Sequence, residues 1–186
     1  MKFIKNIKAL KPIIRKLKIG NFEFRLNMHA LKRMQYAYIC FHAAKLGKKL
    51  GYEKISVIEY GVAGGQGLLI LEEHIKEIEN YLNIKIDIYG FDTGEGLPEP
   101  VDYRDLPYHW KKGFYSMEKD NLKNKLKKAK LIIGNIDKTS KSFFSKYVIF
   151  ESALMFETGS YKLNDFNILV ISDIEERIKR VVNRFF

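Results

Sequence analysis

The stretch "ISVIEYGVAGGQGLL", residues 55–69, decides the fold of this chain. An apolar run ends in Glu59, and four glycines then lead directly into a second apolar run. The first run has the Ile- and Val-rich composition of a buried strand, whereas the second repeats its apolar residues with the period of an amphipathic helix. The stretch therefore predicts a strand, a glycine-rich turn and a helix in immediate succession.

Strand-like and helix-like patterns alternate along the rest of the chain. Strands are predicted at 54–61, 84–92, 130–136, 147–152 and 166–173, and helices at 28–51, 66–83, 117–130 and 174–186. Between them, the segment 93–116 is irregular and holds three of the four prolines. This alternation predicts an α/β fold, a Rossmann-like and mostly parallel sheet of about five strands with helices on both faces.

Length and composition favour a single packed domain. The 186 residues are 46% hydrophobic, which is enough for a real core. The single cysteine, Cys40, cannot form an internal disulfide, and its apolar, helix-like surroundings predict a buried thiol. No apolar run reaches the roughly 18 residues that a membrane-spanning helix needs, and no signal-peptide pattern opens the chain, so we expect a cytoplasmic location.

The net charge of +11 is concentrated in the first quarter of the chain. Residues 1–50 carry 13 Lys and Arg against one acid, Glu23, whereas the remainder is close to neutral. This asymmetry predicts a basic N-terminal extension, residues 1–26, followed by a Rossmann-like domain, residues 27–186, in which residues 151–186 form an atypical tail.

The basic extension begins with an amphipathic pattern. Within residues 1–18, apolar side chains recur at helical spacing among seven basic residues and no acid, and Pro12 is expected to break or kink the helix. A solvated helix packed on its own domain is the plainest interpretation. Peripheral contact with an anionic membrane or with a partner is the alternative. Nucleic acid is disfavoured, because no aromatic residues interleave with the basic ones.

The glycine spacing bears on the ligand. It departs from the dinucleotide pattern G-x-G-x-x-G and lacks the Gly-Lys-Ser/Thr of a phosphate-binding loop. Glu59, two residues before the first glycine, suits a cationic group better than a pyrophosphate. Asp92 ends the second predicted strand, where an acid can accept both hydroxyls of a ribose. Together these features predict a nucleoside with a positive centre, such as S-adenosylmethionine.

Three segments carry a resemblance to a known family. "VIEYGVAGGQG", "IYGFDTGEGLPEPVDYRD" and "KLIIGNI" resemble class I S-adenosylmethionine-dependent methyltransferases. Within that class, "FDTGEGLPEP" is similar to the D-[ST]-F-E-G-L-P stretch of the macrocin O-methyltransferase-like (TylF-like) group. The similarity covers roughly residues 30–140. It implies a Rossmann-like fold and methyl transfer to an oxygen of a small molecule, often a sugar.

The resemblance also implies a set of cofactor-binding residues. These are Glu59, Gly61, Gly64, Gly65, Asp92, Thr93 and Asn135. The residues around the glycine turn would line the methionine end of S-adenosylmethionine, Asp92 with Thr93 would hold the ribose, and Asn135 would lie near the adenine. The local alternatives are a surface or capping acid at Glu59, and helix caps at Asp92 and Asn135.

The irregular segment is a candidate for the acceptor site. Tyr103, Arg104 and His109 belong to the mixture of polar and aromatic residues that binds small polar molecules, so residues 96–113 are interpreted as a lid over the substrate. The alternative is an ordered surface loop that packs its aromatic residues on the sheet. His109 alone is weak support for a general base, so no catalytic residue is assigned, and no metal-ligand set is predicted.

The chain departs from the family's pattern after its fourth predicted strand. A class I methyltransferase has seven strands, and the related group follows its fourth strand with an Asp-rich segment, whereas this chain offers only Glu151 there. A short natural variant would need a partner chain, such as a second copy, to cover its open sheet edge. An interrupted reading frame is the other explanation. We therefore predict a methyltransferase acting on a hydroxyl of a small, sugar-like acceptor, with a non-catalytic, degenerate binding protein tethered by its basic N-terminus as the alternative.

Overall fold

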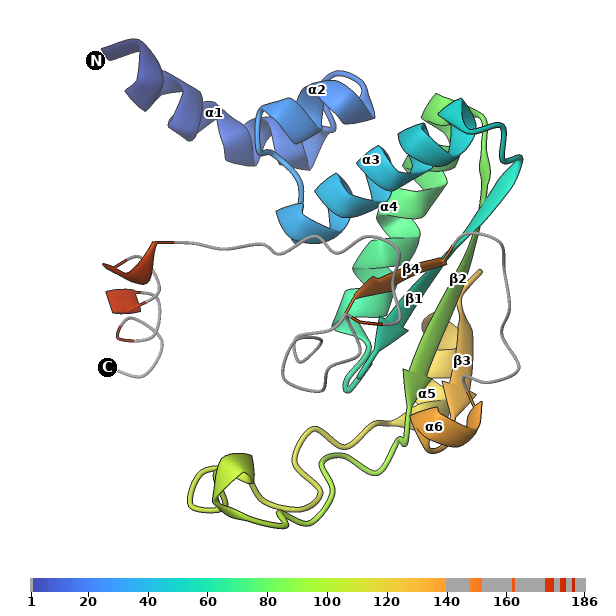
Figure 1. The fold of residues 1–186 in the computed structure, drawn as a ribbon. Helices are drawn as coiled ribbons and strands as arrows, with labels where there is room; N and C mark the ends of the chain where they lie inside the picture. The colour runs from blue at the N-terminus through green and yellow to red at the C-terminus, as the bar shows by residue number, and fades with distance from the viewer. Residues whose placement is uncertain are drawn as a thin grey trace. The chain divides into compact units, whose positions relative to one another are not determined.

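The computed structural model of the chain describes residues 2–139, 148–151, 162, 173–175, 178–179 and 182. The chain divides into two compact units, Met1–Ser152 and Ala153–Phe186. Every strand described below and the glycine-rich turn belong to the first unit (Figure 1). Apart from Asp173, the predicted fifth strand lies outside the described residues, and the described positions of the predicted last helix at 174–175, 178–179 and 182 are helical.

The first unit alternates helices and strands. Its strands are β1 (Lys54–Tyr60), β2 (Lys85–Asp92), β3 (Lys130–Ile133) and β4 (Val148–Glu151). Its helices are α1 (Lys2–Leu17), α2 (Phe22–Asn27), α3 (Met34–Lys49), α4 (Gln66–Leu82), η1 (Tyr103–Asp105), α5 (Lys119–Lys125) and α6 (Ile136–Thr139). The strand, turn and helix predicted from the opening stretch are therefore confirmed as β1, the glycine-rich turn and α4.

The four strands form one parallel sheet in the order β3-β2-β1-β4. The chain moves outward from β1 through β2 to β3 and then returns to the opposite side of β1 for β4. The α/β class with a parallel sheet is thus confirmed, whereas a fifth strand and helices on both faces remain predictions. The reversal lies between β1 and β4, the place where parallel sheets bind ligands beyond the carboxyl ends of their strands.

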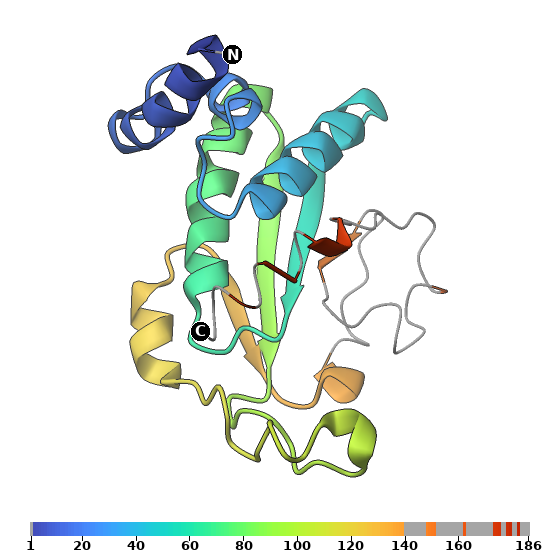
Figure 2. The same cartoon turned by 90° about the vertical axis from the view of Figure 1, so that its left-hand side faces the viewer.

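Helices α3 and α4 lie side by side over one face of the sheet (Figures 1 and 2). Helix α4 packs on β2, and α3 packs on β1. The buried residues of α4 recur every three or four positions, so they lie on one face of the helix. Among the described residues, the largest fully buried side chains are Phe41, Phe91, Ile55, Leu68, Ile75, Ile78, Ile86 and Ile88. This core fixes the carboxyl ends of β1 and β2, from which the candidate site is built.

The N-terminal segment is partly integrated into this core. Phe22 and Leu26 of α2 belong to the main hydrophobic cluster, and the buried Arg25 forms an ion pair with Glu77 of α4. The predicted boundary between residues 26 and 27 therefore passes through a packed region. Pro12 was expected to break or kink the first helix. It does not break it, because α1 continues through Pro12, whereas a kink remains a prediction.

The long helix predicted from residue 28 begins later, at Met34. Arg33 adopts a left-handed backbone conformation with a φ of 40°, which ends the preceding irregular segment and starts α3. Ala30 and Leu31 are buried without being helical, so their apolar character reflects packing and not helical periodicity. The prediction that Cys40 is a buried thiol is confirmed. None of the described helices combines the length and hydropathy required to cross a bilayer.

Candidate functional site

The glycine-rich turn is fastened to the neighbouring strand at the carboxyl edge of the sheet. The amide of Gly61, at the end of β1, donates to the carbonyl of Phe91 in β2 at 2.9 Å. The amide of Gly65 donates to the carbonyl of Val62 at 2.9 Å, which closes the turn, and Gly65 caps α4 with a φ of 82°. The turn therefore presents the N-terminus of α4 at the edge where β1 and β2 end.

Two of the four glycines are required by internal packing. A Cβ on Gly65 would overlap the side chain of Leu122, and its positive φ is one that side chains rarely adopt. A Cβ on Gly67 would overlap Glu59 Oε1 and lie 3.1 Å from Tyr36 Oη. The fold alone explains glycine at these two positions.

The other two glycines face open space. Gly61 has a φ of 81°, so glycine is favoured there by the backbone. Gly64 lacks a positive φ, and no atom among the described parts of the chain lies within 4 Å of a Cβ built on it. Both residues are exposed. Nothing in the described structure requires glycine at position 64, so a ligand approaching the backbone would account for it.

Asp92 joins this turn to the next one. Its Oδ2 accepts a hydrogen bond from the amide of Ala63 at 2.9 Å, and its Oδ1 accepts one from the amide of Gly94 at 2.6 Å. The carboxylate thus links the glycine-rich turn after β1 to the turn after β2. A carboxylate has about four lone-pair sites, so two amide donors leave capacity for two further donors.

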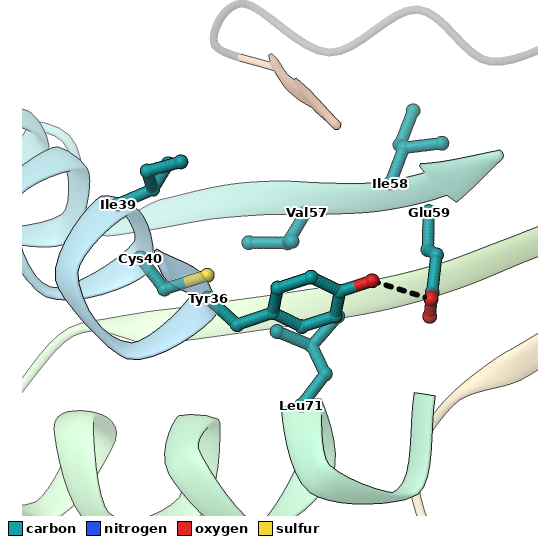
Figure 3. Close-up of a pocket in the computed structure, with 7 residues that line it drawn as sticks. All are labelled: Tyr36, Ile39, Cys40, Val57, Ile58, Glu59 and Leu71. Carbon is teal, nitrogen blue, oxygen red and sulfur yellow. Dashed lines mark hydrogen bonds between the residues drawn. The ribbon is translucent and has the colours of Figure 1, made fainter. Parts of the chain in front are cut away.

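Glu59 is held beneath the turn by residues that the sequence analysis did not identify. It is 4% exposed, and its Oε1 accepts a hydrogen bond from Tyr36 Oη at 2.8 Å (Figure 3). Arg33 Nη1 donates to the same Tyr36 oxygen at 3.3 Å, and its guanidinium lies 5.2 Å from the centre of the Tyr36 ring. The start of α3 therefore fixes the acid that ends β1. The only available sequence signal was the presence of a polar aromatic residue on the apolar face of a helix.

A small, mainly apolar pocket borders this pair. It lies between α3, α4 and β1, and its lining consists of Tyr36, Ile39, Cys40, Val57, Ile58, Glu59 and Leu71 (Figure 3). Glu59 contributes the single acidic group of the lining. The pocket is therefore an apolar space under the sheet edge, with polar atoms only where Tyr36 meets Glu59.

Thr93 and Asn135 flank the central residues. The hydroxyl of Thr93 donates to the carbonyl of Gly96 at 3.4 Å and accepts from the amide of Glu95 at 3.3 Å, so it shapes the turn after β2. Gly134, after β3, donates its amide to the carbonyl of Asp92 at 2.9 Å, which places the exposed Asn135 next to the same edge. Asn135 directly precedes α6, and its carbonyl accepts hydrogen bonds from the amides of Lys138 and Thr139, as a helix-capping residue does.

The predicted lid, residues 96–113, is a loop whose two ends are joined by backbone hydrogen bonds. Leu97 and the chain at 113–114 exchange backbone hydrogen bonds of 2.8 and 2.9 Å, which makes the intervening residues an excursion from the carboxyl edge (Figure 1). Tyr103 is exposed, and the exposed His109 packs edge-on against Trp110 with ring centres 4.4 Å apart. The side chain of Arg104 lies outside the description. Among the described contacts, none brings Tyr103 or His109 to the glycine turn or to Asp92.

The structure thus brings together the predicted residues at the ends of the first three strands, but not those of the lid. Backbone donors of the turn and of the start of α4 lie beside two acidic side chains, an arrangement that can hold a polar ligand with hydroxyl or cationic groups. Within the described ranges, no three His, Cys, Asp or Glu side chains cluster as metal ligands would.

Comparison of the chain with family models, with curated proteins and with solved structures gives no match. The function is therefore inferred from the geometry of this edge and from the resemblance of the sequence segments.

Proposed function

We propose that this chain is a class I S-adenosylmethionine-dependent methyltransferase with a Rossmann-like fold, similar to the macrocin O-methyltransferase-like group. It acts in the cytoplasm on a hydroxyl of a small, sugar-like acceptor. The proposal rests on the edge formed by β1 and β2, where a glycine turn with open space above it is tied to Asp92 by the Ala63 amide. That connection is the single observation that carries it.

The residues present fit S-adenosylmethionine in three respects. Gly61 and Gly64 leave the backbone of the turn accessible, so a ligand can lie directly on it. Asp92 retains acceptor capacity for the two ribose hydroxyls beyond the two amides that it already binds. Glu59 supplies a buried carboxyl group beneath the turn, and we expect the cationic end of the ligand to lie toward it.

The cofactor would supply an electrophilic methyl group, and the residues of the chain would hold the cofactor and the acceptor in position. Methyl transfer needs the acceptor oxygen in line with the sulfonium, together with a group that takes the hydroxyl proton. Tyr103, Arg104 and His109 remain the candidates for contacts with the acceptor. Since Tyr103 and His109 are exposed, acceptor binding on these residues would require the loop at 97–113 to lie over the bound cofactor.

Isothermal titration calorimetry with S-adenosylmethionine and S-adenosylhomocysteine tests the proposal. The parent chain is expected to bind both at a stoichiometry of one. Gly64→Val is expected to weaken binding by at least about tenfold, because its side chain enters the space above the turn. The melting temperature should stay close to that of the parent, because a Cβ at this position meets open space among the described residues. The affinity of Gly64→Ala should lie between that of the parent and that of Gly64→Val.

Gly51→Ala provides the matched control. A Cβ on Gly51 also meets open space, but its φ of 82° strains any other residue, and it lies at the far end of α3. We expect this variant to lose stability and to keep its affinity. If the parent chain releases no heat with either compound, the proposal is wrong. If Gly64→Val binds as tightly as the parent, the turn is not the binding site.

A further inference from the structure

Helix α1 carries an apolar stripe on its surface. Leu10, Ile13 and Leu17 are 47%, 50% and 65% exposed. They occupy positions i, i+3 and i+7 of one continuous helix, so they lie on a single face. Three large apolar side chains in a row on a surface helix form an exposed patch and not an isolated apolar residue.

The adjacent face of α1 holds the helix on the rest of the unit. Ile14 is 7% exposed, and Lys18, one turn later, forms an ion pair with Glu77 of α4 at 3.0 Å. The amide of Ile19 donates a hydrogen bond to the carbonyl of Ile14 at 3.1 Å, which fixes the end of the helix. Because these contacts use one face, the stripe of Leu10, Ile13 and Leu17 remains directed to the surroundings.

Basic residues occupy other positions around α1. At about 100° per residue, Lys16 lies beside the stripe, whereas Lys11 and Arg15 lie farther around the helix. Arg15 and Lys16 are exposed, and residues 1–18 contain seven basic residues and no acid. An apolar stripe on a helix rich in Lys and Arg is the pattern of helices that lie in the interface of an anionic bilayer. A helix of 16 residues with this composition is too short and too charged to span a bilayer.

We propose that α1 docks the protein onto anionic phospholipid surfaces. Leu10, Ile13 and Leu17 enter the boundary between headgroups and acyl chains, and the cations of α1 attract the anionic headgroups. A nucleic acid would satisfy the cations but would offer nothing apolar to the stripe, so the lipid surface fits both parts of the pattern. This inference does not depend on the proposed function at the sheet edge.

Co-sedimentation of the full chain with vesicles tests the inference. We expect binding to vesicles of phosphatidylcholine with about 30% phosphatidylserine, and little binding to phosphatidylcholine alone, since each cation near such a surface adds about fivefold to affinity. The triple variant Leu10→Gln/Ile13→Gln/Leu17→Gln should lose at least about tenfold in affinity while all its charges remain. Its far-ultraviolet circular dichroism should match that of the parent.

Two further variants separate the contributions. Lys11→Gln/Arg15→Gln/Lys16→Gln should lose affinity and also lose most of its dependence on salt. Leu50→Gln removes a leucine of similar exposure, 58%, at the end of α3, and should bind as the parent does. Failure of the parent to bind anionic vesicles would overturn the inference. The inference would also be overturned if the Leu10→Gln/Ile13→Gln/Leu17→Gln variant bound the vesicles as tightly as the parent. It would be overturned as well if the parent bound duplex DNA more tightly than vesicles and this variant kept the same affinity for DNA.

Discussion

The two halves of the glycine-rich turn differ in what they contact. Gly65 and Gly67 are surrounded by the protein itself, against Leu122 and against the Tyr36–Glu59 pair, whereas Gly61 and Gly64 border open space. The first pair is therefore needed for packing, Gly61 is favoured by its backbone conformation, and Gly64 is the position that a ligand would account for. This difference shows that a glycine motif can combine positions required by the fold with positions kept open for a ligand. Substitutions at single glycines can separate the two requirements.

The largest effect is expected on the packed side. Gly65→Ala places a methyl group against Leu122 and forces an unfavourable φ, so we expect a loss of about 2–4 kcal/mol in the free energy of unfolding. Urea denaturation measures it. In a double-mutant cycle, Leu122→Ala should relieve part of this loss, since it removes the overlap but not the backbone strain. Additive effects of the two substitutions would contradict the packing explanation.

Asp92→Asn should affect both halves of the comparison. The amide side chain offers one acceptor where two backbone donors converge, so we expect a loss of about 1.5–3 kcal/mol in stability. Because the substitution also loosens the connection to Ala63, binding of S-adenosylmethionine should weaken. Asp105→Asn is the control. It changes a carboxylate of the exposed loop that accepts a hydrogen bond from the amide of Val101, and it should lower stability and ligand affinity less than Asp92→Asn does.

Tyr36→Phe should have a smaller effect. The change removes the hydrogen bond to Glu59 Oε1 but leaves the ring in place, so we expect a loss of about 1–2 kcal/mol in stability. Glu59→Gln in the same background separates the pair, since the hydroxyl and the acid are expected to be coupled. Independent effects in this cycle would show that the two side chains do not interact in solution.

The smallest effect is expected from pH. Burial lowers the pKa of His74 below its ordinary value near 6.5, against the opposing influences of the Lys32 carbonyl, Glu73 and Glu77. The unfolded chain therefore binds more protons just below that pH, and stability should fall as the pH decreases through about 6.5. Thermal melts from pH 5 to 8 should show this decline, and His74→Gln should flatten it.

The sequence alone was sufficient to predict the helix and the two strands around the glycine-rich turn. Strong apolar runs bounded by glycine or by acids predicted β1, α4 and β2 to within one residue of their observed ends, because these segments are buried in the way that their periodicity requires. The proximity of the turn to Asp92 also followed, since the carboxyl ends of neighbouring parallel strands share one edge.

Long-range contacts could not be predicted in this way. Tyr36 lies 23 residues before Glu59, and no spacing rule connects a helix residue to the end of the next strand. The late start of α3 depends on the left-handed backbone at Arg33, a residue type that gives no such signal. Helix α2 was missed, although Asn21 accepts from the amide of Phe24 as a helix cap does.

Amide chemical-shift mapping during titration with S-adenosylhomocysteine tests the central claim most directly. The claim is that the open half of the turn and Asp92 form one ligand cradle. It predicts saturable shifts at the amides of residues 61–66 and 92–95, with smaller changes along α3 and in the loop at 97–113. Shifts confined to other parts of the chain, or no shifts at saturating ligand, would contradict it.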